Sequence, residues 1–269
     1  MPSVERRPSE HSPSAVHRRK VPEWVRKHFP AEISDSYHGL ADAGELVASG
    51  HGLVLLGTHF SLRDGPGMFL YVASQNDAMI DKPWVAPVAR HITEIARLAN
   101  WVFGARIDLK PVVTASTMEK PRFHHLHRGE GLRDYIISAT DTLKRGGVVA
   151  LFPQSTRVPY LKEPDEYDKA MEFLMSRTSR AQVNDFGILP VGFGVEGVQD
   201  YKKLRGLNPG VKYTINVGKL WTKTEALEMA HETQRSMDGW AIDQLRQLVP
   251  ENYRDIPPSG DIFTAPKLK

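Results

Sequence analysis

The chain has 269 residues, 41% of them hydrophobic and 25% charged, which is typical of a folded globular protein with one sizeable core. It contains no cysteine, which excludes disulfides, thiolate metal ligands and a cysteine nucleophile. A net charge of +3 suits anionic small molecules or surfaces, whereas no nucleic-acid-binding motif and no apolar run of membrane-spanning length is present. We therefore expect a cytoplasmic protein that binds no nucleic acid, with peripheral binding to the inner face of the membrane as the alternative.

The N-terminal segment differs in composition from the rest of the chain. Residues 1–21 are rich in Arg, Ser and Pro and cannot bury a core, so we predict a basic disordered tail there and one domain over 22–269. Residues 22–29 mix aromatic with basic side chains. This stretch is expected to form a short helix that either touches a membrane or packs on the flank of the domain, and its shortness favours the second.

Along the domain, apolar periodicity predicts strands that alternate with helices. The predicted strands span 53–56, 105–113, 148–152, 187–193 and 213–220, and 77–87 is expected as a loop, with or without a short strand at 84–87. The predicted helices span 34–49, 68–73, 91–101, 132–144, 166–180 and 224–248, the last as one long helix or two shorter ones. This alternation predicts an α/β fold, a mostly parallel mixed sheet with helices on both faces. Pro190 interrupts an apolar run, which predicts an edge strand or a strand end there.

The strand at 53–56 leads into a histidine and then an acid. His59 follows this strand, and Asp64 comes five residues after His59. In open α/β sheets ligands bind beyond the carboxyl ends of strands, and His59 would lie there. An imidazole with a nearby carboxylate is the minimum equipment of a general base, because the carboxylate orients the ring and stabilises the imidazolium. The alternative is a turn histidine that is hydrogen bonded to a nearby acid.

A second polar block follows the strand at 148–152. Its residues are Phe152, Pro153, Gln154, Ser155, Thr156 and Arg157. Arg157 offers a planar fork to a phosphate or carboxylate, and the hydroxyls of Ser155 and Thr156 add donors. The position of this block at the carboxyl end of a strand matches that of His59. The alternative is that Arg157 pairs with an acid such as Glu163 on the surface.

Four blocks of the sequence, in this order, are similar to those of a known family. They are His-x-x-x-x-Asp at 59–64, Phe-Pro-x-x-Thr-Arg at 152–157, Leu-Pro-Val at 189–191 and Pro-Glu-Asn-Tyr-Arg at 250–254. The ordered set resembles the glycerolipid acyltransferases, the PlsC-like family that includes lysophosphatidic acid and glycerol-3-phosphate acyltransferases.

The resemblance implies an O-acyltransferase of phospholipid biosynthesis that needs neither a cofactor nor a metal. A fatty acyl group would move from acyl-CoA or acyl carrier protein to a hydroxyl of glycerol-3-phosphate or a lysophospholipid. His59 would deprotonate this hydroxyl and Asp64 would orient His59, as in the family's HX4D motif. Phe152, Pro153, Thr156 and Arg157 match the family's acceptor block, so Arg157 would hold the acceptor phosphate. The second phosphate contact is expected from one of three arginines, of which the first is preferred: Arg106, Arg122 or Arg128.

The chain departs from the family's pattern in the acceptor block. The family carries Phe-Pro-Glu-Gly-Thr-Arg-Ser, where this chain has Gln154 for Glu, Ser155 for Gly and Val158 for Ser. Loss of the carboxylate removes one charge from the acceptor pocket, so an acyltransferase for a different hydroxyl or amine acceptor is an alternative. Two further alternatives are a non-catalytic acyl-lipid binding module and a metal-dependent hydrolase that uses the histidines at 124–127. His91 is expected to be an ordinary structural or surface residue.

Overall fold

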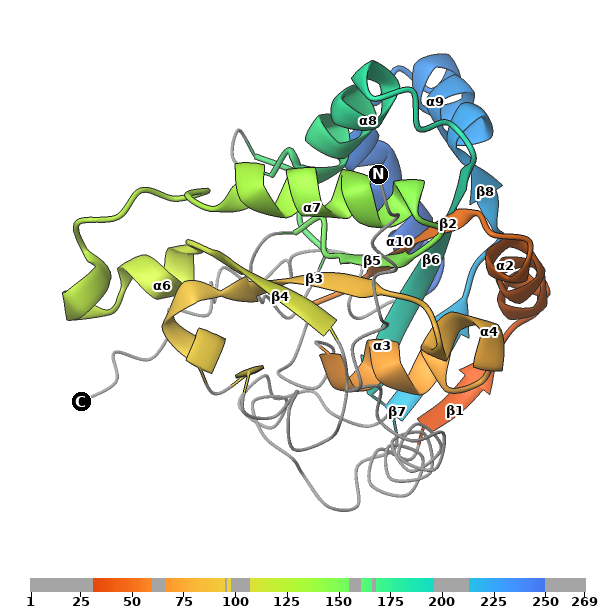
Figure 1. Ribbon diagram of the computed structural model, residues 1–269, viewed down its shortest axis with the longest axis horizontal. Helices are drawn as coiled ribbons and strands as arrows, with labels where there is room; N and C mark the ends of the chain where they lie inside the picture. Colours follow the sequence, from red (N-terminus) through yellow and green to blue (C-terminus); the bar gives the residue numbers. More distant parts are fainter. Residues whose placement is uncertain are drawn as a thin grey trace, which may run out of the picture.

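The computed structural model describes residues 31–59, 66–94, 96–97, 107–154, 161–165, 168–195 and 213–249 (Figure 1). Its strands are β1 (Ala31–Ser34), β2 (Gly52–Gly57), β3 (Trp84–Ala89), β4 (Ile107–Val112), β5 (Val148–Leu151), β6 (Phe186–Val195), β7 (Tyr213–Val217) and β8 (Trp221–Thr222). Its helices are α2 (Gly39–Ala48), α3 (Pro66–Ala73), α4 (Asp77–Ile80), α6 (Ala115–Met118), α7 (Leu132–Lys144), α8 (Ala170–Arg180), α9 (Lys223–Glu232) and α10 (Met237–Arg246). Short 3-10 turns lie at Arg90–Ile92 and Pro121–Phe123.

The strands form one sheet in the order β1-β7-β6-β2-β5-β3-β4, with β8 paired to β6. Strands β6, β2, β5, β3 and β4 run parallel to one another. β7 runs antiparallel to β6, and β1 pairs parallel with β7. The sheet is therefore mixed and mostly parallel, which confirms the prediction of an α/β fold. All residues of β2, at the centre of the sheet, are buried, as expected for a strand that is covered on both faces.

Helices flank the sheet on both faces, as predicted. Gly52 and Gly57 lie five residues apart in β2 and therefore face opposite sides of the sheet. A Cβ atom at Gly52 would meet Leu143 of α7 at 2.8 Å, whereas one at Gly57 would meet the Phe69 ring of α3 at 2.6 Å. In Figure 1, α7 and α8 accordingly lie above the sheet, and α3 and α4 lie below it.

Most predicted elements are present, and the main difference has a local cause. α7 spans 132–144 as predicted, and the stretch 224–248 forms two helices, α9 and α10. α2 begins at Gly39 rather than at 34, because the Asp35 carboxylate accepts the N–H groups of Gly39 at 2.7 Å and Leu40 at 3.0 Å and so caps the helix. β1 and α4 were not predicted, and β1 is held by pairing with β7, far along the chain.

The prediction that Pro190 marks an edge strand or a strand end is wrong. Pro190 lies within β6, an inner strand of the sheet, level with Leu56 of β2. The N–H and C=O of one residue point to the same side of a strand, and the Pro190 carbonyl accepts from Gly218 N–H at 2.9 Å, away from β2. On that side, pairing with β8 ends at Ile188 and pairing with β7 begins at Val191. The missing N–H of Pro190 thus falls between two partner strands and costs no ladder hydrogen bond.

Several predicted segments lie outside the described residues. These are the tail at 1–21, the short helix at 22–29 and the block at 250–254. Within the predicted helix at 91–101, residues 93–94 and 96–97 are helical. Among the described helices, none has the length and apolar character that crossing a bilayer requires.

Candidate active site

β2 and β5 are neighbouring strands, and the helices that follow them lie on opposite faces of the sheet. Leu56 of β2 is level with Leu151 of β5, so both strands end at the same edge. From this edge β2 leads to α3 on one face, whereas β5 leads to α8, which packs on α7 and α10 over the other face. In α/β sheets, ligands bind beyond the carboxyl ends of neighbouring strands that are followed by helices on opposite faces. His59 lies two residues beyond β2, and Phe152 directly follows β5.

Thr58 secures the chain between β2 and His59. Its side chain is fully buried at the point where pairing between β2 and β6 ends. The Phe193 N–H donates to Thr58 Oγ1 at 2.9 Å, and the Thr58 hydroxyl makes a longer contact of 3.5 Å with the Phe193 carbonyl. The hydroxyl thus takes the place of the next backbone group in the ladder. The backbone can therefore leave the sheet before His59, and the buried Phe193 N–H still has a hydrogen-bond acceptor.

The imidazole of His59 lies against a column of three phenylalanine rings. It stacks on Phe152 with 4.5 Å between ring centroids and 28° between the ring planes. Phe152 contacts Phe69 of α3 at 5.0 Å, and Phe69 contacts Phe193 of β6 edge to face at 5.6 Å. Gly57 makes room for the column, since a Cβ atom there would lie 2.6 Å from the Phe69 ring and 3.1 Å from the Phe193 ring. His59 is half-buried, so its ring is packed on aromatic surface and still partly accessible.

Three of the six residues in the second block are described. They directly follow β5, and Phe152 stacks on His59. Phe152 is half-buried, and Pro153 and Gln154 are buried. A neutral amide costs less to bury than a carboxylate, so this position suits Gln154 better than the family's Glu. The other predicted site residues lie outside the described residues: Asp64, Arg106, Ser155, Thr156 and Arg157.

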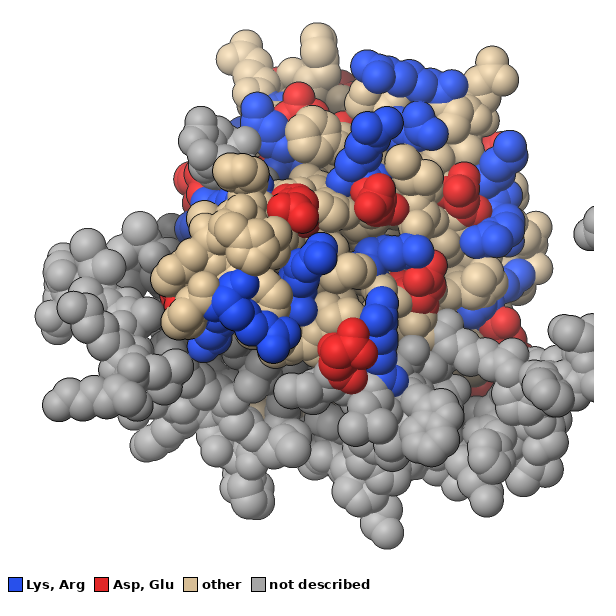
Figure 2. Space-filling view, turned by 60° about the vertical axis from the view of Figure 1, so that its left-hand side comes forward, with Lys and Arg blue, Asp and Glu red and all other residues tan. Residues whose placement is uncertain are grey.

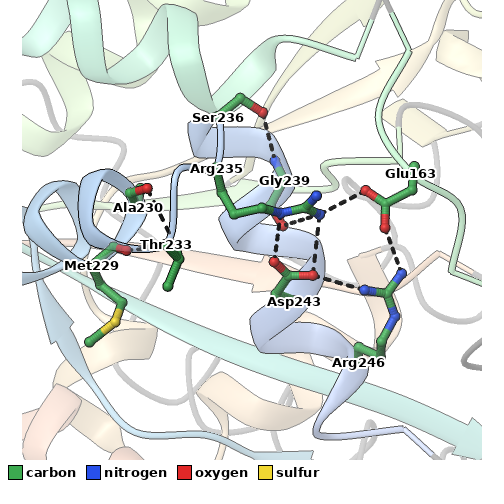
Figure 3. Close-up of polar contacts among 9 residues, drawn as sticks. All are labelled: Glu163, Met229, Ala230, Thr233, Arg235, Ser236, Gly239, Asp243 and Arg246. Atoms are coloured by element: carbon green, nitrogen blue, oxygen red, sulfur yellow. Dashed lines mark hydrogen bonds and ion pairs between the residues drawn. The ribbon is translucent and has the colours of Figure 1, made fainter.

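Ion pairs anchor the segment that leaves the second block to α10 and the turn before it (Figure 3). Glu163 accepts from Arg235 at 2.7 Å and from Arg246 at 2.9 Å, and Asp243 accepts from the same arginines at 2.7 Å and 2.8 Å. The four side chains form a closed ring of alternating charge. Burial alone would raise the pKa of Glu163, but hydrogen bonds from the two arginines, and their charges, lower it overall. Glu163, considered above as a surface partner for Arg157, is thus engaged by two other arginines.

A second ion-pair cluster anchors the same segment through the loop before α7. Arg128 contacts Asp165 at 3.2 Å and Asp168 at 3.3 Å, and Lys162 contacts the same carboxylates at 3.0 Å and 2.7 Å. The Asp168 side chain is fully buried, so these two cations offset a charge that would otherwise be costly to bury. Arg128, one of the three arginines considered for the acceptor phosphate, is part of this cluster.

The adjoining strand ends carry a polar group that the sequence analysis did not single out. His91 follows β3, and its Nδ1 lies 3.0 Å from the buried Thr117 hydroxyl. The hydroxyl of Thr114, which follows β4, lies 3.1 Å from that of Thr117. β3 is two strands from β2 in the sheet order, so His91 lies farther along this edge from His59 than Phe152 does. Its position just after a predicted strand, the same signal that singled out His59, could have identified it.

The loop between β4 and α7 carries exposed basic side chains and histidines. Lys120 and Arg122 have no carboxylate partner within the described ranges, and Arg122 lies over the Phe123 ring at 4.4 Å. Figure 2, which turns this side of the molecule forward, shows Lys and Arg side chains across the face with acidic side chains between many of them. The histidines at 124, 125 and 127 are exposed, and among the described residues no three His, Asp or Glu side chains are grouped as metal ligands.

The carboxyl edge of the sheet thus combines an imidazole stacked on an aromatic ring, a buried amide three residues after β5 and a second imidazole farther along. A scan of the chain against protein-family models found no match, and a search of curated proteins found none either. What the chain does must therefore be inferred from the chemistry of this edge.

Proposed function

We propose that the chain is an O-acyltransferase that moves a fatty acyl group from acyl-CoA or acyl carrier protein to a hydroxyl of a phosphate-bearing acceptor, glycerol-3-phosphate or a lysophospholipid. The observation that carries this proposal is the position of His59 at the carboxyl edge of β2 and β5, stacked on Phe152 at 4.5 Å. Two blocks that are far apart in the sequence, and that the resemblance joins in one mechanism, meet at this point.

Acyl transfer from a thioester needs a base, an oxyanion donor and a clamp for the acceptor, because a thiolate is already a good leaving group. The His59 imidazole takes the proton of the acceptor hydroxyl as the oxygen attacks the thioester carbonyl carbon. The tetrahedral intermediate then collapses, the C–S bond breaks, and the thiolate receives the proton from the imidazolium. In this assignment one imidazole nitrogen takes the proton, and Asp64 orients the ring through the other.

The acceptor phosphate is assigned to the residues that follow Gln154. Arg157 is the principal clamp, Ser155 and Thr156 add hydroxyl donors, and Arg106 is the second cationic contact. Gln154 is uncharged, so it does not bring to the acceptor site the negative charge of the family's Glu. That difference is the reason to test hydroxyl and amine acceptors without a phosphate as a second class.

The decisive experiment is thiol release from acyl-CoA or acyl carrier protein by the purified chain, with and without glycerol-3-phosphate or lysophosphatidate. His59→Gln is compared with His51→Gln, because His51 directly precedes β2 and lies at the opposite edge of the sheet. We expect acceptor-dependent release by wild type and His51→Gln, and a loss of about 10²- to 10⁴-fold in His59→Gln. Equal release by wild type and His59→Gln would exclude His59 as the base.

The proposal includes a peripheral membrane contact when the acceptor is a lysophospholipid. Lys120 and Arg122 lie on the loop after β4, at the same edge of the sheet as His59, and cations near an anionic bilayer contribute about 1 kcal/mol each. Reversing both charges to Glu should weaken sedimentation with phosphatidylglycerol vesicles. The matched control reverses Lys144 and Arg145, which are exposed at the C-terminal end of α7, at the opposite edge of the sheet, and should bind like wild type.

A further inference from the structure

Phe152 is placed for a role other than contact with the acceptor. The resemblance assigns it to the acceptor block, yet its ring contacts are with protein groups. The imidazole of His59 stacks on it at 4.5 Å with 28° between the planes, and the Phe69 ring lies at 5.0 Å, tilted by 45°. The side chain thus lies between the candidate base and the core.

We propose that Phe152 is a positioning residue for His59, whose ring fixes the orientation of the imidazole and stabilises the imidazolium. This inference rests on the proposed function, in which His59 is the base. The face of an aromatic ring attracts a cation that lies within about 6 Å of its centroid, and the imidazole is 4.5 Å away. A neutral imidazole gains less from this attraction than the imidazolium. The ring therefore favours the state that His59 reaches only after it has taken the acceptor's proton.

The column behind Phe152 makes the platform rigid. Phe69 and Phe193 are each only 1% exposed, and they come from α3 and β6. Close-packed interiors resist displacement, so the Phe152 ring cannot tilt away from His59 without moving Phe69. Thr58 fixes the backbone next to His59 through its hydrogen bond with Phe193 N–H. The imidazole and its platform are therefore held by the same strand, β6.

The first test measures the NMR signal of the His59 imidazole and does not depend on acyl transfer. Phe152→Leu removes the ring and keeps apolar bulk, Phe152→Tyr keeps the ring, and Phe173→Leu on α8 is the matched control, since Phe173 is 47% exposed. The NMR signal of the His59 imidazole is assigned with His59→Gln and titrated across neutral pH. We expect the signal to move downfield and its titration midpoint to fall in Phe152→Leu. Both should stay as in wild type in Phe152→Tyr and Phe173→Leu.

The second test separates kcat from KM in acceptor-dependent thiol release. Phe152→Leu should lower kcat by about 3- to 10-fold with an unchanged KM for the acceptor, because the ring stabilises only the protonated state. Phe152→Tyr should restore kcat. A raised KM with kcat retained would assign Phe152 to the acceptor instead.

The two tests also separate this inference from the proposed function. The positioning role would be overturned if the imidazole signal keeps its position and its titration midpoint in Phe152→Leu while the variant has the circular dichroism of wild type. If wild type transfers no acyl group but the imidazole signal responds as expected, the positioning role stands and the proposed function is overturned.

Discussion

Replacing Thr58 with Val isolates the hydroxyl that ends the pairing of β2 with β6. Valine has nearly the same shape, but it offers no acceptor to the Phe193 N–H, which now donates to Thr58 Oγ1 at 2.9 Å. Thr58 is 0% exposed, so water cannot replace the lost partner. A buried donor without an acceptor costs about 1–3 kcal/mol, and we expect the free energy of unfolding to fall by this amount in urea denaturation. If His59 is the base, kcat should fall as well, because Thr58 fixes the neighbouring backbone.

Thr58→Ser is the matched control for this prediction. It keeps the hydroxyl and removes one methyl group, whose loss from the core costs about 0.8 kcal/mol. The order of stability should therefore be wild type, then Thr58→Ser, then Thr58→Val. If Thr58→Val proves as stable as wild type, the hydroxyl contributes nothing and the account of how the backbone leaves the sheet is wrong.

Three other substitutions test the packing and the buried charges. Gly57→Ala places a Cβ atom 2.6 Å from the Phe69 ring, so the free energy of unfolding in urea should fall by about 1–3 kcal/mol. The double variant Gly57→Ala/Phe69→Leu should recover part of this loss. An unchanged free energy of unfolding in Gly57→Ala would contradict the packing. Burial raises the pKa of Asp238 to about 7, so the stability that its proton brings is present below about pH 4 and is lost as the pH rises through about 7. The free energy of unfolding of wild type should therefore fall by about 3 kcal/mol more than that of Asp238→Asn between about pH 5 and about pH 8. The melting temperatures should show the same order, and an equal fall in the two proteins would refute this role. Gln154→Glu buries a carboxylate at a site that is 1% exposed, so it should lose stability as the pH rises over the same range, whereas Gln75→Glu on the surface should not.

The elements that could be predicted from the sequence are those whose causes lie close together along the chain. α7 has an apolar stripe and ends before Gly146, whose φ of 68° suits a glycine, so its bounds agree with the prediction. The predicted start of α8 differs because its cap comes from elsewhere. The Asp238 carboxylate, on α10, accepts the N–H groups of Met171 at 2.9 Å and Glu172 at 3.0 Å. No pattern within residues 166–180 could reveal a partner so far along the chain.

The same distinction applies to the site. That His59 and the block after β5 lie close together could be predicted, because parallel strands bring their carboxyl ends to one edge. The groups that support His59 could not, because Phe69 and Phe193 are ordinary core residues in any local pattern. Only the register of β2 with β6 and the side of the sheet on which α3 packs bring them together. The prediction for Pro190 was wrong for the same reason. An inner strand tolerates a proline at this position because β8 ends before it and β7 begins after it.

The two halves of the candidate site are held by different forces. His59 stacks on the half-buried Phe152 ring, which is backed by buried rings, and the neighbouring Thr58 makes a buried hydrogen bond; dissolved ions weaken none of these contacts. The segment that leaves the second block rests on ion pairs, and the Glu163 side chain in them is 56% exposed. Exposed pairs contribute little and are screened by salt, whereas aromatic packing is not. Rising ionic strength should therefore weaken the contacts of Glu163 with Arg235 and Arg246 first, while the imidazole keeps its orientation on Phe152.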